Sequence, residues 1–255
     1  MSAMSGLLRR YDQGRILKAV FYGLVVGVAA TLAFDYRELA RENALAELAQ
    51  PDSEPILPGL TETGEPLPKD VETSRETLRQ QLAVALEPGG TLSLTGTIGL
   101  GSADLFGEEI ARIGEYVTQV RLDSPGGSVH DALAIGQAVR DRGFETVVEK
   151  GALCASSCPL IFAGGVQRLA ETGATLGVHQ VFAPGNDERD PASAIASAQT
   201  TTARIQRYLE AMDVDPALWT LAMETPPNRL HYLTPDEMRA LRLTGGSAVA
   251  EAAAQ

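Results

Sequence analysis

The sequence predicts an α/β fold with a mainly parallel sheet that is covered on both faces by helices. From about residue 72, short alternating or apolar runs typical of strands are followed by stretches with apolar residues at helical spacing. Strands that alternate with helices in this way indicate βαβ units, whose strands lie parallel to one another. After about residue 191 the pattern is chiefly helical.

The expected elements follow from the periodicity of each segment. In the helix expected at 102–114, Leu105, Ile110 and Ile113 should face the core. In chain order, the elements are a helix at 72–85, a strand at 91–98, helix 102–114, a strand at 117–122, a helix at 128–142, a strand at 144–149, a helix at 156–163, strands at 167–170 and 175–179, helices at 193–212 and 216–223, an extended segment at 231–234 and a helix at 235–241.

Composition indicates a globular protein without a bound cofactor. The chain has 255 residues, 44% of them hydrophobic and 21% charged, which leaves room for one good core plus appendages. A formal net charge of -12 argues against nucleic acid or an anionic membrane surface as the main partner. With only two cysteines, neither a disulfide framework nor a four-ligand zinc pattern is present. We expect no metal and no organic cofactor.

An apolar run near the N-terminus predicts a membrane segment at 16–34. The run Ala19–Phe34 follows a basic segment, 1–15, and is just long enough to cross a hydrocarbon core of about 30 Å. The positive flank predicts that residues 1–15 stay in the cytoplasm and that the rest is exported. Two alternatives remain open, a cleaved signal peptide, because small residues end the run, and a buried core helix.

The remaining boundaries follow from composition. Residues 35–71 read as a weakly amphipathic helix followed by an extended linker rich in proline between Pro51 and Pro68. The main domain is expected at 72–245, and an Ala-rich tail at 246–255 is expected to be flexible.

The first motif is LDSPGGSV at 122–129, which closes one expected strand and opens a helix. Gly126 and Gly127 can adopt backbone conformations that other residues avoid, and they let another chain segment approach closely. Amide groups in such a turn can bind a developing oxyanion. A simple strand-to-helix turn explains the motif equally well.

The second and third motifs each supply a side chain for nucleophilic chemistry. In GALCASSCPLIFAGG at 151–165, two serines lie between a strand and an apolar helix, where helix capping by Ser156 or Ser157 is the plain alternative. In LGVHQ at 176–180, His179 ends a strand-like run, and a neutral imidazole there could accept a serine proton. A lone histidine is more often structural. His130 is not expected to be catalytic, and His231 lies beside the segment discussed below as the source of an orienting group.

Together, the three motifs resemble those of the ClpP peptidase superfamily, which shares its fold with the crotonases and with signal peptide peptidase A. In that family a strand ends in SPGG, a later turn presents a serine on the next helix, and a histidine follows some twenty-odd residues on. Here the matching residues are Ser124–Gly127, Ser156 and His179, and the serine and histidine are 23 residues apart. The resemblance covers roughly residues 90–245.

This resemblance implies a βαβ spiral fold and a role for each matching residue. Ser156 would be the nucleophile and His179 its base, while the backbone N–H groups of Gly127 and Ser157 would form the oxyanion hole. Counting back from Gly165, which matches the glycine that closes the family's apolar helix, favours Ser156 over Ser157 as the nucleophile.

The third catalytic residue is where the chain departs from the family. An Asp often precedes a segment like YLTPDEM, which this chain has at 232–238, but the matching position is Pro226, whose side chain cannot orient an imidazole. Glu224 is the only nearby carboxylate upstream and is our choice, while Thr225 and Asn228 are also close. A Ser–His dyad without a third member is the alternative.

Cys154 and Cys158 lie on either side of the serine, at a separation that a disulfide could span across a strand-to-helix turn. An exported, oxidising setting would permit the bond. Two buried thiols are an equal alternative. If formed, the bond would brace the nucleophile turn, and its reduction could tune activity.

These features lead to the expectation of a serine peptidase anchored in a bacterial inner membrane, with its catalytic domain in the periplasm. Its substrates would be peptides or unfolded protein segments, and self-association is left open. The alternatives are an inactive scaffold with the same fold and a crotonase-like acyl-CoA enzyme, which the export signal disfavours.

Overall fold

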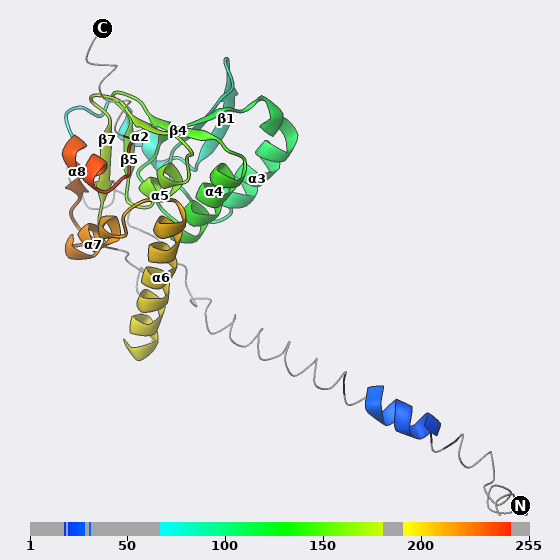
Figure 1. Cartoon of the computed structure of the whole chain (residues 1–255). Coiled ribbons are helices and arrows are strands. Elements are labelled where there is room, and N and C mark those ends of the chain that lie inside the picture. The colour runs from blue at the N-terminus through cyan, green and yellow to red at the C-terminus, as the bar shows by residue number, and fades with distance from the viewer. Residues whose placement is uncertain (1–17, 19, 29–30, 32–66, 181–190, 246–255) are drawn as a thin grey trace, which may run out of the picture. The chain divides into compact units, whose positions relative to one another are not determined.

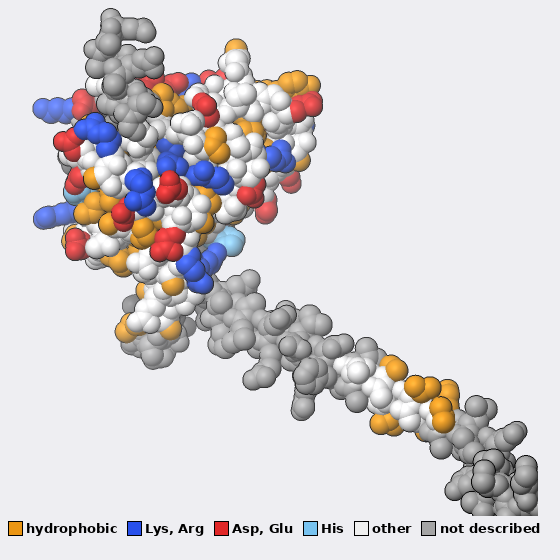
Figure 2. Space-filling model, in the orientation of Figure 1, with side chains coloured by type: hydrophobic (Ala, Val, Ile, Leu, Met, Phe, Trp, Pro, Cys, Tyr) orange, Lys and Arg blue, Asp and Glu red, His pale blue; other side chains and the backbone are white. Residues whose placement is uncertain are grey.

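The computed structural model describes residues 18, 20–28, 31, 67–180 and 191–245. Contacts divide the chain into two units, 1–50 and 51–255, and each is described by itself. In the first unit, residues 20–28 are helical, and their large apolar side chains are exposed (Figure 2). No helix within the described residues combines the length and the apolar character needed to cross a membrane. The predicted segments at 16–34, at 35–71 (the helix and the proline-rich linker) and at 246–255 lie partly or wholly outside the described residues.

The second unit is a mixed α/β domain (Figure 1). Its helices are α2 (Arg75–Arg79), α3 (Ser102–Ile113), the 3-10 turn η1 (Gly114–Tyr116), α4 (Val129–Asp141), α5 (Cys158–Ala163), α6 (Pro191–Ala211), α7 (Ala217–Glu224) and α8 (Pro235–Ala240). Its strands are β1 (Ala83–Glu87), β2 (Thr91–Thr95), β3 (Gln119–Asp123), β4 (Glu145–Val148), β5 (Leu153–Ala155), β6 (Arg168–Ala170), β7 (Thr175–Val178) and β8 (His231–Tyr232).

The strands form two sheets where the sequence predicts one, and most of their pairings are parallel, as expected. One sheet has the order β1-β2-β3-β4-β6, and only β1 runs antiparallel to its neighbour. The other has the order β5-β7-β8, in which β5 and β7 are parallel and β8 is antiparallel. A parallel bridge between Ser124 and Cys154 connects the end of β3 to β5. This bridge joins the first and second motifs.

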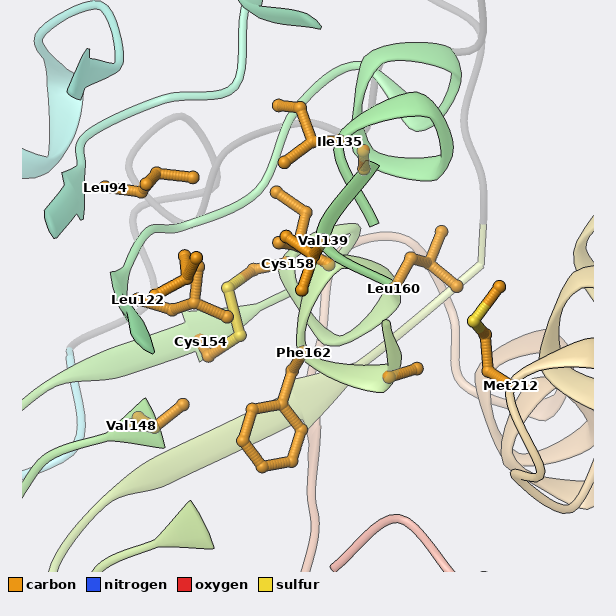
Figure 3. Close-up of a cluster of buried hydrophobic side chains, with 14 of the residues drawn as sticks. Leu94, Leu122, Ile135, Val139, Val148, Cys154, Cys158, Leu160, Phe162 and Met212 are labelled. Atoms are coloured by element: carbon orange, nitrogen blue, oxygen red, sulfur yellow. A yellow bond between two sulfur atoms is a disulfide. The ribbon is translucent and has the colours of Figure 1, made fainter. Parts of the chain in front are cut away.

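The core lies between the sheets and the helices α3, α4 and α5, which pack against one another in chain order. In strand β3, Val120 and Leu122 are buried while the other side chains are half-buried, so one face of the strand lies on the core. Phe162 of α5 points into the same cluster, together with residues of α4 (Figure 3). Each fully buried side chain of this size contributes about 1.5–3 kcal/mol.

Helix α4 approaches α5 and α6 closely at Gly136. A Cβ atom built on Gly136 would lie 2.0 Å from the Tyr208 hydroxyl oxygen and 2.8 Å from the Leu160 carbonyl oxygen. The Tyr208 hydroxyl donates a hydrogen bond of 2.8 Å to that same carbonyl. The glycine therefore leaves the space in which α6 attaches to α5, the helix that follows Ser156.

Two arginines hold the C-terminal ends of α5 and α6. Arg140 donates to the carbonyl oxygens of Ala163, Gly165 and Met212, and Arg168 donates to the same three. Burial, followed by repulsion from Arg140, lowers the pKa of Arg168. Cations at these positions satisfy carbonyls that have no partner within their own helix.

The expected helix at 72–85 is wrong beyond residue 79. Helix α2 ends at Arg79, and residues 83–87 form β1, which pairs antiparallel with β2 across a turn containing Gly89 and Gly90. Ladder hydrogen bonds and burial of Leu82 against the core outweigh the helix propensity of this Ala- and Leu-rich stretch.

Two further expectations need correction. Leu105 is 40% exposed, and Phe106 is the buried residue on this turn of α3. The expected helix at 156–163 begins only at Cys158, because residues 153–155 form β5 and Ser156 lies in the turn between them. The serine is therefore held by backbone geometry that a helix would not provide.

We predict that Gly136→Ala destabilises the domain by about 1–3 kcal/mol, because the added methyl group overpacks the contact with Tyr208 and Leu160. Gly107→Ala is the matched control, since it lies in α3 with nothing within 4 Å of the new Cβ and should stabilise slightly. Denaturant unfolding measures both variants. Equal stability of the two would contradict this packing.

Candidate active site

The structure brings Ser156 and His179 together. The Nε2 atom of His179 lies 2.9 Å from the Oγ of Ser156, and both residues are buried. Their strands explain the contact, because β5 pairs in parallel with β7 and places Ala155 opposite Gly177. The carboxyl ends of the two strands are therefore adjacent, and each catalytic candidate follows one of them.

The backbone at Ser156 adopts a conformation that is uncommon for a residue with a side chain. Its φ angle is 68°, in the left-handed region, which costs about 1–2 kcal/mol for an L-residue. The N–H of Ser156 donates a hydrogen bond of 2.8 Å to the carbonyl of Gly177, and this bond helps to hold the turn. Strained residues of this kind cluster at functional sites.

At each glycine of the SPGG motif another chain segment comes too close for a side chain, as the sequence predicts. Gly126 has a φ of 93°, and a Cβ on it would lie 2.5 Å from the Cβ of Ser156. Gly127 has a φ of 144°, and a Cβ there would lie 2.1 Å from the Ile98 carbonyl oxygen. The segment that approaches Gly126 is the nucleophile turn itself, so a side chain at Gly126 would push the two motifs apart.

Two backbone amides beside the serine have no hydrogen bond to any other described residue. They belong to Gly127 and Ser157, the residues predicted to form the oxyanion hole. Neighbouring amides are used, since Ser128 donates to the Ile98 carbonyl and Ser156 donates to that of Gly177. Preorganised N–H groups of this kind stabilise an oxyanion when they lie within hydrogen-bonding distance of it.

Burial determines the charge state of His179. Its side chain is 3% exposed, and this desolvation lowers its pKa to about 4, with the Pro227 carbonyl acting in the opposite direction. The ring is therefore neutral at pH 7, and Nε2 can accept the proton of Ser156. The other ring nitrogen, Nδ1, is buried and forms no hydrogen bond of normal geometry with a described residue.

The structure does not bring Glu224 to the imidazole. Glu224 is exposed at the C-terminal end of α7, and the Thr225 side chain donates to the carbonyl of Leu221 instead. Asn228 is also exposed. None of these three side chains forms a hydrogen bond with His179.

In the loop that follows α7, the group that acts on the pKa of His179 is the backbone carbonyl of Pro227, which raises it. Main-chain contacts hold the loop in place, because the N–H of Gln180 donates to the Thr225 carbonyl at 2.9 Å and its side chain donates to that of Met223 at 2.6 Å. Sequence reasoning looked for a side chain beside Pro226. A backbone carbonyl carries no residue-type signal, so the sequence offered no means of finding it.

A disulfide joins Cys154 and Cys158 across the nucleophile turn, with 5.2 Å between their Cα atoms. Both cysteines have no exposed surface, and Figure 3 shows the bond in the apolar cluster near Leu122 and Phe162. It joins β5 to the first residue of α5, so the turn that carries Ser156 is closed covalently. Because a reductant must enter the core to reach the bond, this burial opposes regulation by reduction in the native state.

The other two histidines have partners elsewhere. His130 is exposed and lies 3.4 Å from the Arg204 guanidinium. His231 pairs with Glu237 at 2.9 Å. Neither contacts the Ser156–His179 pair through its side chain.

Comparison with models of known protein families gives no match, and comparison with curated proteins gives none either. The functional assignment therefore depends on the geometry of the site.

We predict that replacing both cysteines, as Cys154→Ala with Cys158→Ala, lowers the free energy of unfolding by about 2 kcal/mol, the loop-entropy effect of so short a loop. In the wild type, a reductant and an alkylating reagent should modify neither cysteine until denaturant is added. Mass spectrometry measures the modification. Alkylation of the denatured protein without reductant would show that the bond is absent.

Stability should also depend on pH through His179. Its native pKa of about 4 lies below the ordinary value of 6.5, so the unfolded state binds more protons between these values and stability falls as pH decreases through that window. At pH 4.5 the loss relative to pH 7 should be about 2–3 kcal/mol smaller in His179→Asn than in the wild type.

Denaturant midpoints at the two pH values measure this difference. Identical pH dependence in His179→Asn and the wild type would contradict the assigned desolvation.

Proposed function

We propose that this chain is a serine peptidase of the ClpP/crotonase type. Ser156 attacks a peptide carbonyl, His179 takes its proton and returns it to the leaving amine, and the amides of Gly127 and Ser157 bind the oxyanion. The observation that carries the proposal is the 2.9 Å contact between the serine hydroxyl and a neutral, buried imidazole. The mostly parallel sheets and the order of the motifs are compatible with that superfamily.

The remaining geometry supports the same chemistry. The left-handed backbone at Ser156 and the disulfide around it give the nucleophile one fixed direction. Water would then hydrolyse the acyl group from Ser156, with His179 acting again as base. No described group requires a metal or an organic cofactor in these steps. The substrates implied by the family resemblance are unfolded segments, signal peptides or membrane-protein tails.

The site would work as a dyad of Ser156 and His179, in which the Pro227 carbonyl takes the place of a third side chain. A carboxylate in the third position stabilises the imidazolium that forms during proton transfer, and its loss typically lowers the rate by orders of magnitude without abolishing it. Among the described residues, no carboxylate forms a hydrogen bond with His179. We therefore propose a slow hydrolase.

We also propose that residues 16–34 tether the domain to a bacterial inner membrane, with the domain in the periplasm. The helical part, 20–28, exposes apolar side chains that bilayer contact would cover. The disulfide fits an oxidising compartment.

A non-catalytic scaffold is the second candidate function. It is favoured by the buried Nδ1 atom, which has no hydrogen bond of normal geometry to a described residue, and by the burial of Ser156, which is 4% exposed. In such a protein the serine and histidine would remain only as packing residues.

A fluorophosphonate probe separates the two functions, because it reacts covalently only with an activated serine. We expect the wild type to be labelled at Ser156, and the labelling to be lost in Ser156→Ala and reduced at least about a hundredfold in His179→Ala. Ser157→Ala should retain most of the labelling, since only the backbone of Ser157 takes part. Intact-mass spectrometry measures the adduct.

Absence of labelling in the wild type would favour the scaffold. Loss of labelling in Ser157→Ala alone would reverse the roles of the two serines.

A further inference from the structure

Asp123, the last residue of β3, binds two segments at once. Its Oδ2 accepts a hydrogen bond of 2.5 Å from the hydroxyl of Thr73, and its Oδ1 accepts one of 3.0 Å from the N–H of Leu153. Leu153 begins β5, three residues before Ser156. We propose that Asp123 is a positioning residue that couples the segment 67–74 to the nucleophile turn, an inference that rests on the peptidase function proposed above.

The same segment is joined to the strand that precedes His179. The N–H of Glu72 donates to the Gly151 carbonyl at 2.8 Å, and the N–H of Gly151 donates to the Gly173 carbonyl at 3.1 Å. Gly173 lies in the turn before β7, which ends one residue before His179. Displacement of Glu72 would therefore disturb the supports of both catalytic side chains.

A small apolar cluster, separate from the main core, fills the space behind this contact. Leu78 of α2 packs with Leu153 and Ala155 of β5. The partly buried members are Leu67, Val71 and Leu230. Ala155 directly precedes the nucleophile, and Leu230 belongs to the loop that carries Pro227. The cluster thus links the segment 67–74 to the serine and to the loop behind the histidine.

A third connection reaches the turn at Ser124–Gly127, called the glycine turn below. The Thr97 hydroxyl donates to the Leu78 carbonyl at 2.8 Å, and the Thr97 N–H donates to that of Gln80 at 2.8 Å. The next residue, Ile98, donates to the Gly126 carbonyl at 2.9 Å. Contacts from 67–80 therefore extend to the glycine turn, to the strand before Ser156 and to the turn that precedes β7.

The sequence assigned residues 67–71 to the end of a linker, whereas their contacts place them beside the supports of the site. The hydroxyl of Thr73 has one defined acceptor, so its removal tests the coupling without creating a large cavity. Misplacement of a nucleophile by about 1 Å can cost a hundredfold in rate. A change at Thr73 should therefore be measurable at Ser156.

The test uses the full-length chain with Thr73→Val, which keeps the shape of the side chain and removes the donor. Hydrogen exchange of the amides at 153–157 should become about tenfold faster, the effect of losing one hydrogen bond to a charged group, while exchange in β2 and β3 stays unchanged. Fluorophosphonate labelling should slow by a similar factor. Thr73→Ser keeps the hydroxyl and should show the exchange and labelling rates of the wild type. The matched control is Thr118→Val at an exposed threonine, which should change neither rate.

Unchanged exchange at 153–157 in Thr73→Val, or faster exchange throughout the domain, would overturn the coupling. If the wild type itself is not labelled, the peptidase function fails, and the exchange experiment alone then decides whether Asp123 couples the two segments.

Discussion

Parallel pairing between β5 and β7 places Ala155 opposite Gly177, so that Ser156 and His179 leave their strands side by side. The bridge from Ser124 to Cys154 adds the end of β3 to this arrangement and brings the glycine turn against the serine. The two turns are so close that Gly126 must remain a glycine, because the Cβ of Ser156 fills the position that a side chain at Gly126 would take. A shift of one strand would separate all three turns.

This arrangement desolvates the imidazole ring of His179. Burial keeps the imidazole neutral and strengthens its contact with the serine hydroxyl, since electrostatic interactions are stronger away from water. The same burial leaves Nδ1 without a hydrogen bond of normal geometry to a described residue, and the carbonyl of Pro227 only partly offsets the desolvation. A base with so low a pKa is also a weak proton acceptor. The site is therefore well ordered around Ser156, the proposed nucleophile, and poorly supported behind His179, the proposed base.

The sequence was sufficient for the parts of this site that depend on residue type and spacing. The motifs at 122–129, 151–165 and 176–180 do converge, and the strand expected at 117–122 overlaps β3. Prediction from the sequence failed where tertiary contacts determine the local structure. Strand β1 forms within a helix-favouring stretch because β2 lies beside it, and the carbonyl of Pro227 acts on His179 through a group that every residue possesses. Glu224 satisfied the chemical requirement but lies exposed at the end of α7.

The central claim is that a neutral, buried His179 activates Ser156. The pH dependence of the second-order rate constant for fluorophosphonate labelling tests it most directly, because this constant reports the ionisation of the free enzyme. The rate should rise with pH through a midpoint of about 4 and then level off before pH 7. A midpoint near the ordinary histidine value of about 6.5, or no labelling at any pH, would contradict the account.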